Sequence, residues 1–134
     1  MLPRFLLDTH AAVRWVSESK KLSRQQGQVL AQALRRAEPV TVCSISLLEM
    51  AVLASQGRLR LKLSLEQVFE ELQAIPMFRI LPLTYEIAQE VASMGSALKD
   101  PADRAIVATA RVHRLRLLTS DHRIIDSKLV AVVD

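Results

Sequence analysis

The sequence predicts an α/β fold in which helices cover both faces of a parallel sheet. Short apolar runs alternate with longer segments of helical periodicity, and the apolar runs lack a polar face. Strands of this kind are typical of parallel sheets, because crossover helices bury them on both sides, with right-handed connections as the default. With 134 residues, and only three glycines and five prolines for linkers, one domain over residues 1–134 is expected.

The first half of the chain is expected to contain two strands separated by helices. The apolar run at 5–7 predicts a strand, and a helix should begin near Thr9. Residues 24–37 place apolar side chains on one helical face. The β-branched run at 40–43 predicts the second strand, and helical spacing returns over 46–56.

The second half continues this alternation. A helix is expected over 64–74, where Ser64 and Gln67 have the spacing of a capping box. The remaining expected elements are helices at 84–98 and from Asp100 to about His113, and strands at 79–81, 115–119 and 129–133.

The single cysteine and the apolar segments indicate a cytoplasmic protein. Cys43 lies in an apolar stretch and has no partner for an internal disulfide, which fits a reducing compartment. Arg4 and Asp8 interrupt the short apolar N-terminus, so no secretion signal is expected. No apolar run approaches the roughly 18 residues that cross a bilayer.

Four acidic residues lie where the pattern turns from strand to helix: Asp8, Glu49, Asp103 and Asp121. Because the carboxyl ends of parallel strands meet at one crevice, these side chains are expected to converge. Each pair would repel by roughly 3 kcal/mol at about 5 Å and an effective dielectric near 20. A divalent cation would relieve that cost, and oxygen-only ligands favour Mg²⁺ or Mn²⁺ over Zn²⁺. The sequence therefore predicts a metal-dependent enzyme.

Two of these acids could instead have a purely structural role in capping a helix. Asp8 could cap the following helix, although Thr9 could do so instead and leave Asp8 free. Glu49 could close a capping box with Ser46. The apolar helical neighbours of Glu49 favour a partly buried carboxylate that needs a partner.

The other two acids also have ordinary uses. Asp103 would be the third residue of a helix capped by Asp100, and its helical neighbours place it toward the core. Asp121 alone would be a turn residue. Arg104 is expected to be a solvated charge. Four acids at four strand-to-helix junctions favour a functional site more strongly than any one of them does alone.

The charge of the chain is compatible with a polyanionic substrate. The net charge is +4, from 18 Lys and Arg against 14 Asp and Glu. If four acids share one pocket, the remaining surface is more basic than this total indicates. Many small domains are equally basic, so the charge alone decides nothing.

The acidic residues and their neighbours resemble the motifs of the PIN-domain family, most closely the VapC toxins of toxin–antitoxin pairs. Residues 7–15 resemble the opening motif, except that Arg14 replaces a commonly apolar residue at a position expected to face solvent. Residues 46–49 resemble the second motif, residues 100–108 the third and residues 118–121 the fourth. The resemblance covers essentially the whole chain, in the family's order and spacing.

This resemblance implies a PIN-like fold and a Mg²⁺- or Mn²⁺-dependent endoribonuclease able to act on single strands. Asp8, Glu49, Asp103 and Asp121 would be both catalytic and metal-binding residues. Asp8 and Asp103 would be the principal ligands, while Glu49 and Asp121 would complete the shell or orient the attacking water. The resemblance further implies a homodimer and an antitoxin whose C-terminal segment occupies the active-site groove.

Three other functions fit the sequence less well. A catalytically inactive PIN-like module that binds RNA or protein is disfavoured by the intact acidic quartet. A phosphohydrolase of the haloacid dehalogenase type would need a second aspartate two residues after Asp8, where this chain has His10. A response-regulator receiver would need a late lysine, and Lys128 is poorly placed for it.

The alternating segment 58–63 leaves three interpretations open. It could be a basic edge that guides RNA, an apolar stripe for a partner chain, or a connection whose leucines are core. Leu59, Leu61 and Leu63 look exposed, and with the hydrophobic content of the chain they predict dimerisation through an apolar surface. Trp15 is expected in the core or at an interface.

Overall fold

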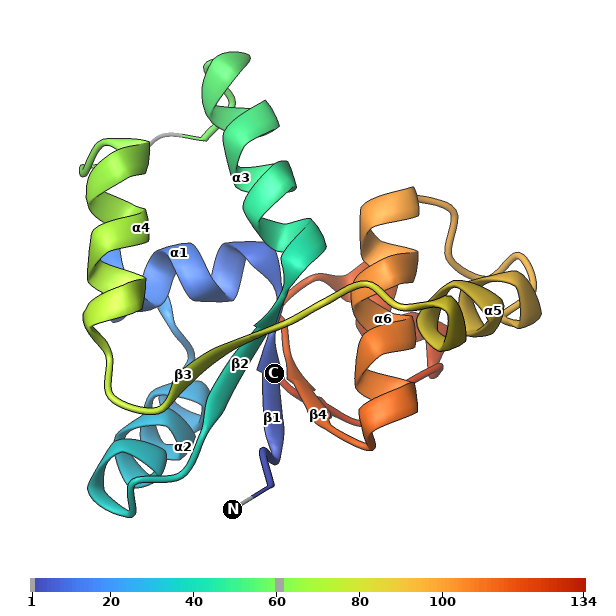
Figure 1. Cartoon of the computed structure of the whole chain (residues 1–134), viewed down its shortest axis with the longest axis horizontal. Coiled ribbons are helices and arrows are strands. Elements are labelled where there is room, and N and C mark those ends of the chain that lie inside the picture. The colour runs from blue at the N-terminus through green and yellow to red at the C-terminus, as the bar shows by residue number, and fades with distance from the viewer. Residues whose placement is uncertain (1, 60–61) are drawn as a thin grey trace.

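The structure is a computed structural model that describes residues 2–59 and 62–134. Within these residues, five strands form one all-parallel sheet in the order β3-β2-β1-β4-β5 (Figure 1). The strands are β1 (Phe5–Leu7), β2 (Val40–Cys43), β3 (Phe78–Leu81), β4 (Arg116–Leu118) and β5 (Val132–Val133). The predicted α/β class and parallel sheet are confirmed.

Helices connect these strands and flank the sheet. They are α1 (Thr9–Ser17), α2 (Arg24–Arg35), α3 (Ser44–Ser55), α4 (Leu65–Ala74), α5 (Tyr85–Ser93), α6 (Pro101–His113) and α7 (His122–Ser127), with a 3-10 turn η1 (Ser19–Lys21) after α1. None of the helices in the described part of the chain is long and apolar enough to span a membrane.

Two apolar layers sandwich the sheet, because successive residues of a strand point to opposite faces. In β1, Phe5 and Leu7 pack in one layer with buried side chains of α1, α2 and α4, whereas Leu6 packs in the other with α5 and α6. Figure 1 shows α1 and α4 on one side of the sheet and α5 and α6 on the other. The central strands β1 and β2 are therefore buried on both faces, which explains why their sequences lack a polar face.

The strand order creates a crevice at the carboxyl ends of β1 and β4. The chain proceeds from β1 through β2 to β3 on one side, then places β4 and β5 on the other side of β1. Ligands of open α/β sheets bind at such a reversal. The β1–β4 pairing extends past the strands, since the Asp8 amide donates to the Leu118 carbonyl at 3.1 Å. This bond holds the segments after β1 and β4 side by side.

Some predicted boundaries were wrong. The helix expected over 84–98 ends at Ser93, and Gly95 follows with a φ of +72°, which glycine adopts without strain. The helix expected from 46 begins at Ser44, and the strand expected over 129–133 is shorter. Helix α7 and η1 were missed, because such short helices carry no detectable apolar period.

The segment that alternates basic and apolar residues belongs partly to the core. Leu59 and Leu63 are half-buried and pack against the α1, α2 and α4 layer, as does Trp15. Leu61, with residue 60, lies outside the described residues. The exposure expected for Leu59 and Leu63 as a dimer contact is therefore wrong.

Arg104 fixes the loop that leads into α6, so the expectation of a solvated charge is wrong. Its guanidinium donates hydrogen bonds to the carbonyls of Val91, Gly95 and Leu98, each at 2.6 Å. These bonds tie the end of α5 and the following loop to the first turn of α6. That turn carries Asp103, so Arg104 also sets the position of a predicted site residue.

Replacing Arg104 by alanine should lower the free energy of unfolding by about 2 kcal/mol, because three carbonyls lose a charged donor. Chemical denaturation monitored by circular dichroism measures this change. Arg35→Ala is the matched control, since Arg35 is exposed at the end of α2. Equal stability of the two variants would contradict the role given to Arg104.

Candidate active site

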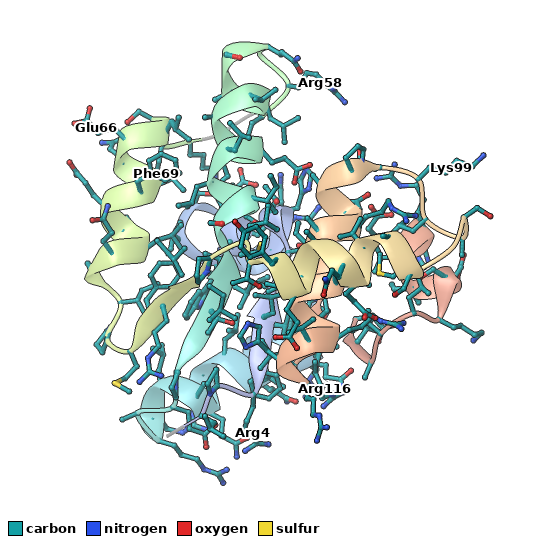
Figure 2. All side chains as sticks on the ribbon, turned by 45° about the vertical axis from the view of Figure 1, so that its right-hand side comes forward. Arg4, Arg58, Glu66, Phe69, Lys99 and Arg116 are labelled. Carbon is teal, nitrogen blue, oxygen red and sulfur yellow. The ribbon has the colours of Figure 1, made fainter. Side chains whose placement is uncertain are left out.

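A pocket of about 180 Å³ lies at the carboxyl ends of β1 and β4 and contains all four predicted acids. Its lining includes Asp8, Glu49, Asp103 and Asp121, together with Asp100, Arg58 and Arg123. Figure 2 shows Arg58 beyond the end of α3, at the top of the view. The structure thus brings the four predicted residues together and adds a fifth carboxylate and two cations.

Asp8 occupies the turn from β1 into α1 and is almost fully buried. Its Oδ1 accepts a hydrogen bond from the Ala11 amide at 2.8 Å, so Asp8 is the N-cap of α1. The alternative cap, Thr9, is buried and its hydroxyl makes no hydrogen bond in the described structure. Burial raises the pKa of the Asp8 carboxyl, against hydrogen bonds from Thr119 and Ala11. Asp8 therefore combines a capping role with a place in the pocket.

Glu49 lies in the second turn of α3 and is half-buried. The helix begins at Ser44 after the N-cap Cys43, so Ser46 is the third helical residue and cannot form the N-cap of a capping box with Glu49. That structural alternative is wrong. The carboxylate of Glu49 instead has an oxygen within 4.8 Å of one oxygen each from Asp100 and Asp103.

Asp103 enters the pocket from the first turn of α6. As the sequence predicts, Asp100 caps this helix and Pro101 is its first residue; Oδ1 of Asp100 accepts from the Asp103 amide at 3.0 Å. Oδ2 of Asp103 is buried and accepts no hydrogen bond in the described structure; the nearest cation, Nη2 of Arg123, is 3.5 Å away. Burial, followed by the charge of Asp100, raises the pKa of Asp103 to about 7.

Asp121 follows β4 and caps α7 through the Arg123 amide at 2.9 Å. The Arg123 guanidinium also donates to both carboxylate oxygens of Asp121, at 3.2 and 2.8 Å. These bonds lower the pKa of Asp121, so this acid stays ionised. Sequence reasoning missed Arg123, although a basic residue two positions after a predicted site acid was an available signal.

The four acids do not all follow strands directly. Asp8 comes directly after β1 and Asp121 lies in the short connection from β4 to α7, but Glu49 lies one turn into α3 and Asp103 lies in the first turn of a helix that follows α5 and a loop. The first turn of α6 nevertheless reaches the same crevice, because the α5–α6 connection returns the chain to the carboxyl end of the sheet.

The chemistry of the pocket fits a divalent cation. Its donors are carboxylate oxygens, which suit Mg²⁺ or Mn²⁺. One of them, Oδ2 of Asp103, is buried without a hydrogen bond, and a carboxylate oxygen in that state needs a positively charged partner. Arg123 offsets the charge of Asp121 and, more weakly, that of Asp103. The carboxylates of Asp8, Glu49 and Asp103 lack an equivalent close cation among the described residues.

Comparison with known proteins places this fold and pocket in a family. The sequence model of the PIN domain matches residues 5–128. The chain belongs to the PIN-domain family. It is 35% identical over 120 residues to Ribonuclease VapC22 of Mycobacterium tuberculosis (strain ATCC 25618 / H37Rv), which covers 89% of this chain and 88% of that protein.

Solved structures share this PIN fold. VapBC2 from Rickettsia felis, bound to a DNA fragment from its promoter, superposes with a TM-score of 0.70 at 14% identity over 96% of each chain. A toxin–antitoxin complex from Klebsiella pneumoniae gives a TM-score of 0.60 at 22% identity, over 96% of this chain and 95% of that one. At these identities the likeness establishes the fold.

The raised pKa of Asp103 predicts a pH-dependent stability in metal-free buffer. Between the ordinary value of 3.8 and about 7, the folded state retains a proton that the unfolded state releases. The free energy of unfolding should therefore fall as pH rises through this window, by about 2 kcal/mol between pH 5.5 and 7.5 for this one group. Thermal melts in EDTA measure the change.

The variant Asp103→Asn isolates this contribution, because asparagine does not titrate. The difference in melting temperature between wild type and variant should move steadily in favour of the variant as pH rises. Parallel pH profiles for the two proteins would show that Asp103 is ionised throughout.

Proposed function

We propose that this PIN-domain protein is a Mg²⁺- or Mn²⁺-dependent endoribonuclease that acts in the cytoplasm as the toxin of a toxin–antitoxin pair. The observation that carries the proposal is the buried Oδ2 of Asp103, which accepts no hydrogen bond, in a pocket shared with Asp8, Glu49 and Asp121. The similarity to Ribonuclease VapC22 supports RNA as the substrate. The net charge of +4 also suits a polyanionic substrate.

Asp8 and Asp103 are proposed as the principal metal ligands. Asp8 accepts hydrogen bonds from Ala11 and Thr119, which leaves further lone pairs of its carboxylate for a cation, and Asp103 offers an Oδ2 that accepts no hydrogen bond. A cation bound there would neutralise the scissile phosphate and make an attacking water more acidic. Asp100 lies within ligand range of Glu49 and Asp103, so it also belongs to the proposed site.

Glu49 and Asp121 are proposed to complete the site and orient the attacking water. The Glu49 carboxylate is half-buried at the pocket wall, where it can accept a hydrogen bond from water. Asp121 is held ionised and in a fixed orientation by Arg123. An ionised, positioned carboxylate can accept a hydrogen bond and so aim a lone pair of the water at the phosphorus.

Asp8→Asn and Asp103→Asn should each reduce RNA cleavage by roughly 100-fold or more, because a metal ligand loses its charge. Folding should survive, since asparagine at position 8 caps a helix about as well as aspartate. At position 103 asparagine keeps the shape and removes a repelling carboxylate. The assay is cleavage of single-stranded RNA in Mn²⁺, with Asp126→Asn as a control because Asp126 is exposed on α7 and absent from the pocket lining. Near-wild-type cleavage by either site variant would exclude that residue as a ligand.

A cognate antitoxin is the proposed protein partner. The support is the similarity of the fold to chains in VapBC2 from Rickettsia felis and in the Klebsiella pneumoniae toxin–antitoxin complex. We propose that the C-terminal segment of the antitoxin occupies the groove over the carboxylate pocket. Such a segment would exclude RNA from the acids and so block cleavage.

A homodimer is proposed as well, because apolar side chains remain exposed on one stretch of α3. Leu48 is 59% exposed and Val52, one turn later, is 43% exposed. Burying such a pair is favourable, at about 25 cal/mol per Å² of apolar area. Light scattering at micromolar concentration should give twice the 15.0 kDa chain mass.

The variant Leu48→Glu should shift the protein toward monomers, because a charge would be buried in the contact. Leu34→Glu, at an exposed leucine of α2, is the matched control and should leave the mass unchanged. A wild-type monomer, or a Leu48→Glu dimer as stable as wild type, would contradict this contact.

A further inference from the structure

A second pocket, of about 320 Å³, adjoins the carboxylate pocket. Both are lined by Asp8, His10, Asp121 and Arg123, so the two spaces share one wall. The remaining charged residues differ: the carboxylate pocket adds Glu49, Asp100, Asp103 and Arg58, whereas the second pocket adds Arg14 and the hydroxyl of Ser120. The second pocket therefore lacks three of the five carboxylates but keeps two guanidinium groups, those of Arg14 and Arg123, as hydrogen-bond donors.

Arg14 reaches this pocket from α1. It lies four residues after His10, and residues at that spacing share one face of a helix. The acid one turn further, Glu18, forms its own ion pair with Lys21 at 2.6 Å. Arg14 makes no side-chain hydrogen bond among the described residues and is half-buried, so its guanidinium donors remain available to a ligand. The expectation that Arg14 faces solvent is therefore incomplete, because its side chain also lines this pocket.

Ser120 is a donor held in place by the fold. The buried Gln26 donates its side-chain amide to Oγ of Ser120 at 3.3 Å and to the Val133 carbonyl at 3.0 Å. Since the serine oxygen already accepts this bond, its own proton is free to be donated. A buried amide that orients an exposed hydroxyl beside two arginines makes a site for an anion.

Arg123 forms the boundary between the two pockets. Its Nη2 lies 2.8 Å from Asp121 and 3.5 Å from Asp103, on the carboxylate side. Those bonds offset the charge of Asp121, which would otherwise repel an anion in the second pocket. The other carboxylate of this pocket, Asp8, is almost fully buried and presents little charged surface to a ligand. The side chain is 70% exposed, so part of the guanidinium can also face a ligand.

We infer that Arg14 and Ser120 form a subsite for an RNA phosphate next to the scissile one, with Arg123 at its border. The inference rests on the proposed ribonuclease function and extends it from the reacting phosphate to its neighbour. Successive phosphates along one strand lie close enough for adjoining pockets to hold them. The chemistry of the subsite suits an anion, whereas that of the carboxylate pocket suits a cation. Arg14 is thus a positioning residue for the substrate.

The test compares Arg14→Ala with Arg35→Ala, which removes an equal charge at the far end of α2, where the strands have their amino ends. Cleavage is measured on a single-stranded oligoribonucleotide and on a dinucleoside monophosphate that has only the scissile phosphate. Arg14→Ala should raise KM for the oligonucleotide roughly tenfold, the effect of losing one charged hydrogen bond, with little change in kcat. On the dinucleoside monophosphate, the wild type, Arg14→Ala and Arg35→Ala should have the same KM and kcat. On the oligonucleotide, Arg14→Lys should recover part of the loss.

Binding provides a readout that does not need cleavage. Fluorescence anisotropy with the same oligonucleotide, against salt concentration, should show a log–log slope that is smaller by about 0.7 for Arg14→Ala than for Arg35→Ala. The subsite is overturned if Arg14→Ala has the same binding slope and KM as Arg35→Ala. It is also overturned if Arg14→Ala impairs cleavage of the dinucleoside monophosphate as much as cleavage of the oligonucleotide. Absence of RNA cleavage by the wild type would instead reject the proposed function, while the binding slopes would still decide the subsite.

Discussion

Mutual repulsion of carboxylates at the carboxyl ends of β1 and β4 is the constraint on which the rest of the site depends. Five acidic side chains line one pocket of about 180 Å³. Each close pair costs roughly 3 kcal/mol at about 5 Å and an effective dielectric near 20, so several pairs would exceed the margin of stability of a small domain. The fold must offset this cost, and protonation is one way to do so: burial, with a smaller contribution from neighbouring carboxylates, raises the pKa of Asp8 and of Asp103.

Helix capping is one way in which the protein offsets the repulsion. Asp8, Asp100 and Asp121 are the N-caps of α1, α6 and α7, so three helix N-termini are directed toward the pocket. Each terminus carries a partial positive charge that stabilises a nearby anion by about 0.3–1 kcal/mol. Arg123 adds a full charge beside Asp121. Asp103 Oδ2 accepts no hydrogen bond and has only the guanidinium of Arg123, shared with Asp121, at 3.5 Å, so a metal ion would complete its neutralisation.

The fold and the residues that make up the site could be predicted from the sequence to different degrees. Apolar runs such as Phe5–Leu7 predict a parallel sheet, because burial on both faces leaves no polar periodicity. The acids were found through the same logic, although Asp103 reaches the crevice by way of a helix. Capping was harder to predict: Asp8 serves as cap and pocket residue at once, and a pattern of residue types cannot separate two roles of one side chain.

Long-range contacts could not be predicted from spacing. Arg104 binds carbonyls up to 13 residues away, and Gln26 reaches Ser120 across 94 residues. Both contacts depend on how helices pack after the strands have paired. Helix α7 brings Arg123 to Asp103 for the same reason: its sequence is too short to carry a period, and its position follows from the β1–β4 pairing.

The anomalous difference map of a crystal soaked with Mn²⁺ tests metal binding in the carboxylate pocket most directly. We expect a peak in this pocket, with oxygens of Asp8 and Asp103 at about 2.0–2.2 Å, the range of hard divalent cations with carboxylates. Arg123 should stay paired with Asp121 while Oδ2 of Asp103 turns to the metal. A fully soaked crystal without a peak in this pocket, or with manganese bound only elsewhere, would contradict the claim that carboxylate repulsion is resolved by a cation.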